Sequence, residues 1–141
     1  MKRYLRSQIL DDLKHKMVFL GGPRQVGKTT LARSLLRSDS AYFNWDFGEH
    51  REKILKMEFP RQPLLVLDEL HKYRKWRNYL KGFYDVRGKD YQILVTGSAR
   101  LDYYRFGGDS LQGRYHYLRL HPFSAAELRI RTAASLMDLI R

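Results

Sequence analysis

Short apolar runs alternate along the chain with segments whose apolar residues recur at helical spacing. The runs at 17–20, 64–67 and 92–96 are almost continuously apolar, which is typical of strands buried on both faces of a sheet. The predicted strands are 17–20, 41–45, 64–67, 92–96 and 115–120. The predicted helices are 31–36, 49–57, 73–83, 101–106 and a last one capped by Ser124.

This alternation predicts a three-layer α/β fold with a mostly parallel five-stranded sheet. Successive parallel strands are joined by right-handed crossovers, and the connecting helices cover the sheet. In such sheets a ligand binds beyond the carboxyl ends of the strands. Candidate chemistry is therefore expected just after Leu20, Leu67 and Val95, and polar motifs follow all three positions.

The composition fits one globular domain. The chain has 141 residues, of which 43% are hydrophobic and 13% aromatic, and this excludes an intrinsically disordered chain. No apolar run approaches the roughly 18 residues of a membrane span, and the basic N-terminus lacks the apolar stretch of a secretory signal. The absence of cysteine excludes disulfides and thiolate chemistry. A cytoplasmic location without a membrane partner is therefore expected.

The chain is strongly basic. It carries 27 Lys and Arg against 15 Asp and Glu, a formal net charge of +12. The excess is spread along the sequence without a polybasic tail. Two interpretations remain open: a DNA, RNA or other anionic partner, or a solvated basic surface.

A phosphate-binding loop motif follows the first predicted strand. The sequence Gly22-Pro23-Arg24-Gln25-Val26-Gly27-Lys28-Thr29 matches G-x-x-x-x-G-K-[ST]. Backbone N–H groups of such a loop surround phosphate oxygens. Lys28 can reach the β- and γ-phosphates, Thr29 can ligate Mg²⁺, and Thr30 can cover the α-phosphate. An ordinary glycine-rich turn is the less favoured interpretation, because a strand precedes the motif and a helix follows it.

Two carboxylates, Asp68 and Glu69, end the apolar run 64–67. Asp68 can orient Mg²⁺, and Glu69 can act as the general base that activates water. Four apolar residues followed by Asp-Glu are a weak pattern alone, but their position 40 residues after Lys28 strengthens it. The adjacent glutamate is typical of hydrolysing P-loop ATPases rather than of small-molecule kinases.

Polar residues also end the strand 92–96. Thr96 or Ser98 can hydrogen-bond the attacking water or the γ-phosphate. Ser98 is the preferred catalytic candidate because it lies past the strand end, and it can also cap the next helix.

An arginine precedes the last predicted strand. Arg114 is a candidate arginine finger toward the γ-phosphate of a neighbouring subunit. A surface arginine or an internal salt bridge is the open alternative. Arg100 and Arg105 are weaker candidates for the same role.

Residues 71–77 interleave basic and aromatic side chains. Such a pattern occurs on surfaces that bind single-stranded nucleic acid. The favoured interpretation is one helix with Tyr73 and Trp76 packed inward and its basic residues solvated. The five histidines of the chain show no metal-ligand spacing.

Together these motifs resemble one known family. Residues 21–30, 67–76, 96–100 and 111–124 are similar to the prokaryotic AAA+-like P-loop ATPases described as archaeal or bacterial predicted ATPases. The resemblance covers about residues 3–128. It implies a sheet of order 5-1-4-3-2, ATP and Mg²⁺ as ligands, and the roles given above to Lys28, Thr29, Asp68, Glu69 and Ser98.

Members of that family continue into a helical lid and a C-terminal domain, whereas this sequence ends at Arg141. Residues 1–141 are therefore expected to form a single ATPase core without the lid and accessory domain, weakly active or inactive alone. Residues 121–127 also depart from the family's usual Pro-Leu-Ser-Phe-x-Glu.

The leading prediction is Mg²⁺-dependent hydrolysis of ATP to ADP and phosphate, coupled to a partner domain or macromolecule. The alternative is a module that senses nucleotide or binds nucleic acid without turnover. A small-molecule kinase is disfavoured by the Asp68-Glu69 pair and by the lack of an evident lid for a second substrate. A homo-oligomer or a protein partner also remains open.

Overall fold

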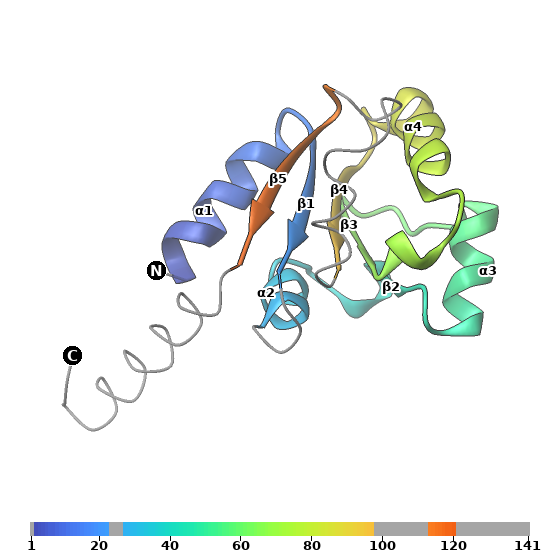
Figure 1. Cartoon of the computed structure of the whole chain (residues 1–141), viewed down its shortest axis with the longest axis horizontal. Coiled ribbons are helices and arrows are strands. Elements are labelled where there is room, and N and C mark those ends of the chain that lie inside the picture. The colour runs from blue at the N-terminus through green and yellow to red at the C-terminus, as the bar shows by residue number, and fades with distance from the viewer. Residues whose placement is uncertain (1, 23–26, 98–112, 121–141) are drawn as a thin grey trace.

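The computed structural model describes residues 2–22, 27–97 and 113–120 of the chain. These residues form one five-stranded sheet with helices on both sides (Figure 1). The strands are β1 (Met17–Gly21), β2 (Tyr42–Asn44), β3 (Leu64–Asp68), β4 (Gln92–Thr96) and β5 (Tyr115–Arg119). The helices are α1 (Lys2–Leu13), α2 (Lys28–Ser34), α3 (Gly48–Lys56) and α4 (Trp76–Arg87), with short 3-10 turns η1 (Asp39–Ala41) and η2 (Leu70–Lys72).

The strand order is β2-β3-β4-β1-β5, and every neighbouring pair is parallel. This confirms the predicted α/β fold and the order 5-1-4-3-2. β4 lies between β1 and β3, with Val95 opposite both Phe19 and Leu67. The carboxyl ends of β1, β3 and β4 therefore meet at one edge of the sheet, as the sequence predicts.

The two faces of the sheet carry separate apolar cores. Val18 and Leu20 of β1 pack on one face with residues of α1 and α2. Met17 and Phe19 pack on the other face with residues of α3 and α4. This is the alternation that a strand imposes on successive side chains, and it makes the structure three layers thick.

Some predicted elements differ from those observed, and others lie outside the described residues. Ala41 ends η1 instead of starting the second strand, because the Ser38 side chain accepts a hydrogen bond from the Ser40 amide and shapes a turn there. The helix predicted from Tyr73 begins at Trp76, because η2 intervenes. α1 is an additional helix. The predicted helices 101–106 and that capped by Ser124 lie outside the described residues.

No helix within residues 2–22, 27–97 and 113–120 is long and apolar enough to cross a membrane.

Candidate functional site

Two glycines frame the predicted phosphate-binding loop. Gly22 directly follows β1 with a φ of 132°, and a Cβ atom there would lie 2.4 Å from the backbone oxygen of Leu120. Gly27 directly precedes α2 with a φ of 90°. Both angles lie in the region that glycine adopts at little cost. The predicted loop residues between them lie outside the described part of the chain: Pro23, Arg24, Gln25 and Val26.

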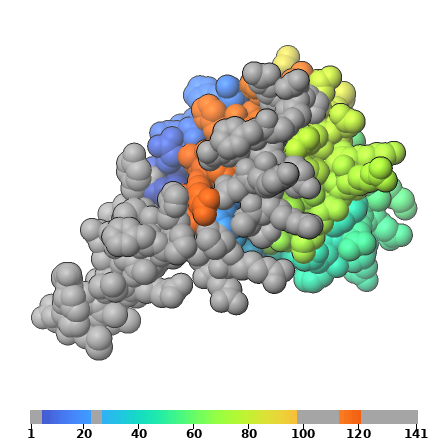
Figure 2. Space-filling view, in the orientation of Figure 1, coloured from blue at the N-terminus to red at the C-terminus, as the bar shows by residue number. Residues whose placement is uncertain are grey.

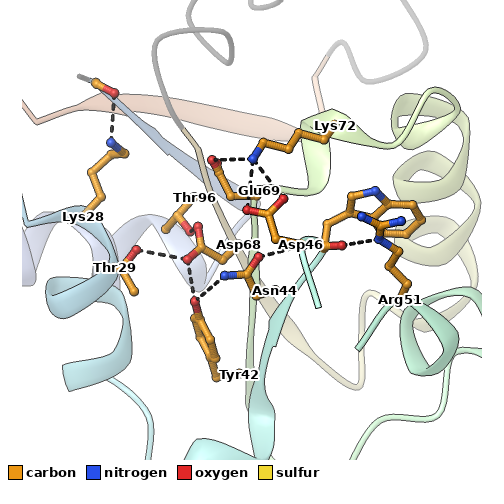
Figure 3. A network of polar contacts seen from close by, with 12 residues as sticks. Lys28, Thr29, Tyr42, Asn44, Asp46, Arg51, Asp68, Glu69, Lys72 and Thr96 are labelled. Carbon is orange, nitrogen blue, oxygen red and sulfur yellow. Dashed lines mark hydrogen bonds and ion pairs between the residues drawn. The ribbon is translucent and has the colours of Figure 1, made fainter. Parts of the chain in front are cut away.

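The side chains of Lys28 and Thr29 lie at the carboxyl edge of the sheet (Figure 3). Lys28 is buried, and its Nζ donates to the backbone oxygen of Gly22 at 2.9 Å. Thr29 Oγ1 donates to Oδ2 of Asp68 at 3.0 Å. The next residue, Thr30, is exposed. The structure thus brings together the loop lysine, the hydroxyl and the first carboxylate that the sequence predicts.

Asp68 ends β3 and is only 5% exposed. Besides Thr29, its carboxylate accepts the hydroxyl of Tyr42 at 2.6 Å on Oδ2 and the hydroxyl of Thr96 at 2.7 Å on Oδ1. Hydrogen bonds from three hydroxyls thus fix the position of the carboxylate. Because Thr29 uses its hydrogen on Asp68, its oxygen lone pairs stay available for a cation. Hydroxyl and carboxylate oxygens suit a hard cation such as Mg²⁺.

Tyr42 and Asn44 of β2 extend this network and were not predicted. Asn44 Nδ2 donates to the Tyr42 hydroxyl oxygen at 3.2 Å, and Asn44 Oδ1 accepts the Asp46 backbone N–H at 2.8 Å. Burial and the bond to Asp68 raise the pKa of the Tyr42 phenol above its usual value, so the phenol stays a donor. Two polar residues spaced two apart at the end of a strand share one face, and that signal could have found them.

Glu69 directly follows β3 in a left-handed conformation with a φ of 60°. Its backbone N–H donates to the Thr96 oxygen at 2.8 Å, which fixes the turn. The side chain is 13% exposed, and Oε2 has no hydrogen-bond partner among the described residues. Burial raises the pKa of the Glu69 carboxyl, and the charge of Lys72 opposes this shift.

Lys72 lies between two carboxylates. Its Nζ is 3.8 Å from Oε1 of Glu69 and 2.9 Å from Oδ1 of Asp46. Figure 3 shows the resulting contacts between the segment after β2 and the segment after β3. Glu69, the predicted general base, therefore has a cation beside one carboxylate oxygen, while its second oxygen is buried.

The two candidates at the end of β4 have different outcomes. Thr96 is fully buried and donates to Asp68. Its hydroxyl therefore positions the carboxylate, and the prediction that Thr96 meets the attacking water is disfavoured. Ser98, together with Arg100 and Arg105, lies outside the described residues.

Arg114 lies at the opposite edge of the sheet from this site. It directly precedes β5, and its backbone oxygen accepts the N–H of Met17, the first residue of β1. Its guanidinium pairs with Asp85 of α4 at 2.9 Å. The internal salt bridge that was the open alternative is therefore present, and five residues of strand, about 16 Å, separate Arg114 from the loop end of β1.

The aromatic residues of 71–77 face inward. Trp76 is 5% exposed, and Tyr73 stacks on Trp45 with ring centroids 4.6 Å apart. Arg74 and Lys75 are exposed. This confirms the packed interpretation of the aromatic residues and leaves no exposed aromatic platform among residues 71–77 for stacking on bases.

The fold and this arrangement define a P-loop ATPase-like module. Residues 14–129 match the family profile described as AAA domain, and the chain belongs to this AAA domain family. A search of curated protein sequences finds no match.

Solved structures are similar to this chain at low sequence identity. Pif1 helicases at forked double-stranded DNA align with a TM-score of 0.50 and 14% identity over 85% of this chain and 42% of that chain. PCH-2 from C. elegans aligns with a TM-score of 0.45 and 18% identity, over 85% of this chain and 41% of that chain. The third structure is a signal transduction ATPase with numerous domains and a tetratricopeptide repeat sensor, from Pyrococcus horikoshii. It aligns with a TM-score of 0.49 and 16% identity, over 94% of this chain and 28% of that chain. The chain thus spans less than half of each.

Proposed function

We propose that this chain binds ATP with Mg²⁺ and hydrolyses it to ADP and phosphate, coupled to a partner domain or macromolecule. The observation that carries the proposal is the Thr29–Asp68 hydrogen bond, 3.0 Å long. It joins the first turn of α2 to the carboxylate that ends β3, and the two residues lie 39 apart in sequence. Buried Lys28 supplies the positive charge beside them.

Each described residue has one role in the proposed reaction. Lys28 leaves the Gly22 oxygen and binds the β- and γ-phosphates. Thr29 would hold Mg²⁺ directly, and Asp68 would hold it through a water ligand. When bound, Mg²⁺ neutralises charge that develops on the phosphate oxygens. Glu69 takes the proton of the water that attacks the γ-phosphorus, and ADP leaves as the bond to its β-phosphate oxygen breaks. Ser98 is proposed to bind the γ-phosphate or that water.

Two substitutions separate binding from turnover. Lys28→Ala removes the charge that faces the phosphates, so we expect it to lose the rise in melting temperature that Mg²⁺-ATP gives the wild type. Glu69→Gln keeps the shape of the site but cannot accept the proton, so it should keep that rise and lose phosphate release by about 100-fold or more. An unaltered rise in Lys28→Ala would refute the site assignment.

A nucleic-acid partner is the second candidate, and one feature of the chain favours it. Residues 70–84 contain five Lys and Arg and no Asp or Glu. Arg74 and Lys75 are exposed just before α4, while Trp76, Leu80 and Phe83 are buried. The yellow-green atoms of this region reach the molecular surface in Figure 2. A basic surface without exposed aromatic residues suits contacts with phosphates rather than with bases.

Reversing two charges tests this partner. Arg74→Glu with Lys75→Glu should weaken binding to a single-stranded oligonucleotide at least tenfold and reduce its salt dependence, because each lost phosphate contact removes a released counterion. Lys53→Glu with Lys56→Glu changes the net charge equally at exposed positions of α3 and should bind nearly as the wild type does. Equal losses in both double variants would show only a non-specific charge effect.

A further inference from the structure

The Asp68 carboxylate is held by three separate elements. Thr29 comes from α2, Tyr42 from β2 and Thr96 from β4, and their hydroxyls lie 2.6–3.0 Å from the carboxylate oxygens. A carboxylate has about four acceptor positions, so three are occupied. The carboxylate cannot rotate or shift without breaking at least one of these bonds.

The direction of the Tyr42 hydrogen bond is fixed by its neighbours. Asn44 Oδ1 accepts the Asp46 backbone N–H, so the amide nitrogen of Asn44 faces Tyr42 and can only donate to it. The hydroxyl hydrogen of Tyr42 is therefore directed to Asp68, at 2.6 Å. A chain of three hydrogen bonds thus runs from the segment after β2 to the carboxylate.

The ring of Tyr42 is also held in place. It is 8% exposed, and the Arg33 guanidinium lies 4.6 Å from its centroid. Arg33 is in turn paired with Asp39 at 2.8 Å. The phenol therefore acts as a fixed support for Asp68 rather than as a side chain that swings toward it.

We propose that Tyr42 is a positioning residue that makes this site select Mg²⁺ over the larger Ca²⁺. Mg²⁺ binds oxygen at about 2.0–2.1 Å in a strict octahedron, whereas Ca²⁺ needs about 2.3–2.6 Å and more ligands. A carboxylate held on three sides cannot move outward, so it fixes the water ligand that it orients at the shorter Mg²⁺ distance and penalises the larger Ca²⁺. The inference rests on the proposed function, because Thr29 and Asp68 must be the metal-holding pair.

Tyr42→Phe tests this role because it removes only the hydroxyl. The measurement is binding of a fluorescent ATP analogue during titration with MgCl₂ or with CaCl₂, and the quantity is the ratio of the two half-saturating metal concentrations. We expect the preference for Mg²⁺ to fall about threefold or more in Tyr42→Phe, since one strong hydrogen bond to a charged group is lost. Asn44→Ala should change the ratio in the same direction by less.

Tyr84→Phe is the matched control. Its hydroxyl bonds the His15 backbone oxygen, just before the start of β1 at the opposite edge, and its loss should leave the ratio unchanged. The role of Tyr42 would be overturned, with the proposed function left intact, by an unchanged ratio in both Tyr42→Phe and Asn44→Ala. A fall in Tyr84→Phe equal to that in Tyr42→Phe would have the same consequence. Metal-independent nucleotide binding by the wild type would instead refute the metal site in the proposed function, and the selectivity with it.

Discussion

The conformation and the burial of Glu69 both lower the stability of the folded protein. Its backbone has a φ of 60°, a conformation that costs a non-glycine residue about 1–2 kcal/mol. Its carboxyl is largely buried with one oxygen unpartnered among the described residues. Such costs concentrate at functional sites. Glu69 is therefore expected to trade stability for reactivity.

This cost has a defined pH dependence. Burial raises the pKa of Glu69, so the native state holds a proton there more tightly than the unfolded chain does. The resulting stabilisation is complete below the unfolded pKa, near 4.5. It is lost as the pH rises through the higher folded pKa. Ionised Glu69 therefore lowers the free energy of unfolding at neutral pH.

Glu69→Gln removes this ionisation and should raise the melting temperature at pH 7.5. The difference from the wild type should shrink as the pH approaches 4.5, because protonated Glu69 resembles Gln. Thermal unfolding at several pH values measures both trends. The exposed Glu58→Gln should show neither effect. Equal melting temperatures for Glu69→Gln and the wild type at pH 7.5 would contradict the cost of burial.

At the same scale, linear motifs could be predicted and cross-strand partners could not. Short sequence motifs contain Lys28, Thr29, Asp68 and Glu69. Residue type and spacing within these motifs are enough to predict their chemistry. The hydroxyl of Tyr42 meets Asp68 across 26 residues of sequence. Only the pairing of β2 with β3, which sets Asn44 opposite Asp68, creates that neighbourhood.

At the scale of elements, the strands were predicted best. β1, β3 and β4 are continuous apolar runs, because helices cover both faces of the sheet there. Such runs predict buried strands directly. α1 is less evident because charged residues surround its apolar ones, although Leu5, Ile9 and Leu13 recur every four residues. The helix after η2 begins later than predicted because Tyr73 leaves the helical path to stack on Trp45.

Two glycines, one inside α4 and one just after β1, should respond oppositely to an added methyl group. Gly82 lies inside α4 with nothing within 4 Å of an added Cβ, so Gly82→Ala should stabilise the protein by about 1 kcal/mol. At Gly22 the positive φ and the Leu120 oxygen both oppose a Cβ, so Gly22→Ala should cost about 1–3 kcal/mol. Urea unfolding measures both. Stabilisation by Gly22→Ala would show that the loop tolerates a different backbone path.

At the scale of the whole molecule, the right-handed connections predict a parallel three-layer sheet, and the resemblance to the AAA+-like ATPases supplies the strand order that is observed. The place of Arg114 follows from that order. β5 runs parallel to β1, so the residue before β5 lies at the edge opposite the loop. Arg114 can therefore meet a γ-phosphate only in a second copy of the chain. Sequence alone could not distinguish this from its pairing with Asp85.

Mixing two impaired variants tests that geometry. If Arg114 acts on a neighbour, Arg114→Ala and Glu69→Gln subunits should each be impaired in ATP hydrolysis, yet mixed assemblies should regain part of the activity. In such an assembly one intact Glu69 meets one intact Arg114. Phosphate release measured across mixing ratios gives the answer. Wild-type activity in Arg114→Ala alone would refute a role of Arg114 in hydrolysis.

The central place of β1 also sets when this molecule can be completed during synthesis. Val18 pairs with Leu94 and with His116, which the ribosome delivers 76 and 98 residues later. Leu120 then packs its backbone against Gly22. Both partner strands of β1 are thus made long after β1 itself. A nascent chain would carry β1 unpaired until β4 and β5 have been made, and under the proposed function the capture of nucleotide would mark the moment at which β5 is in place.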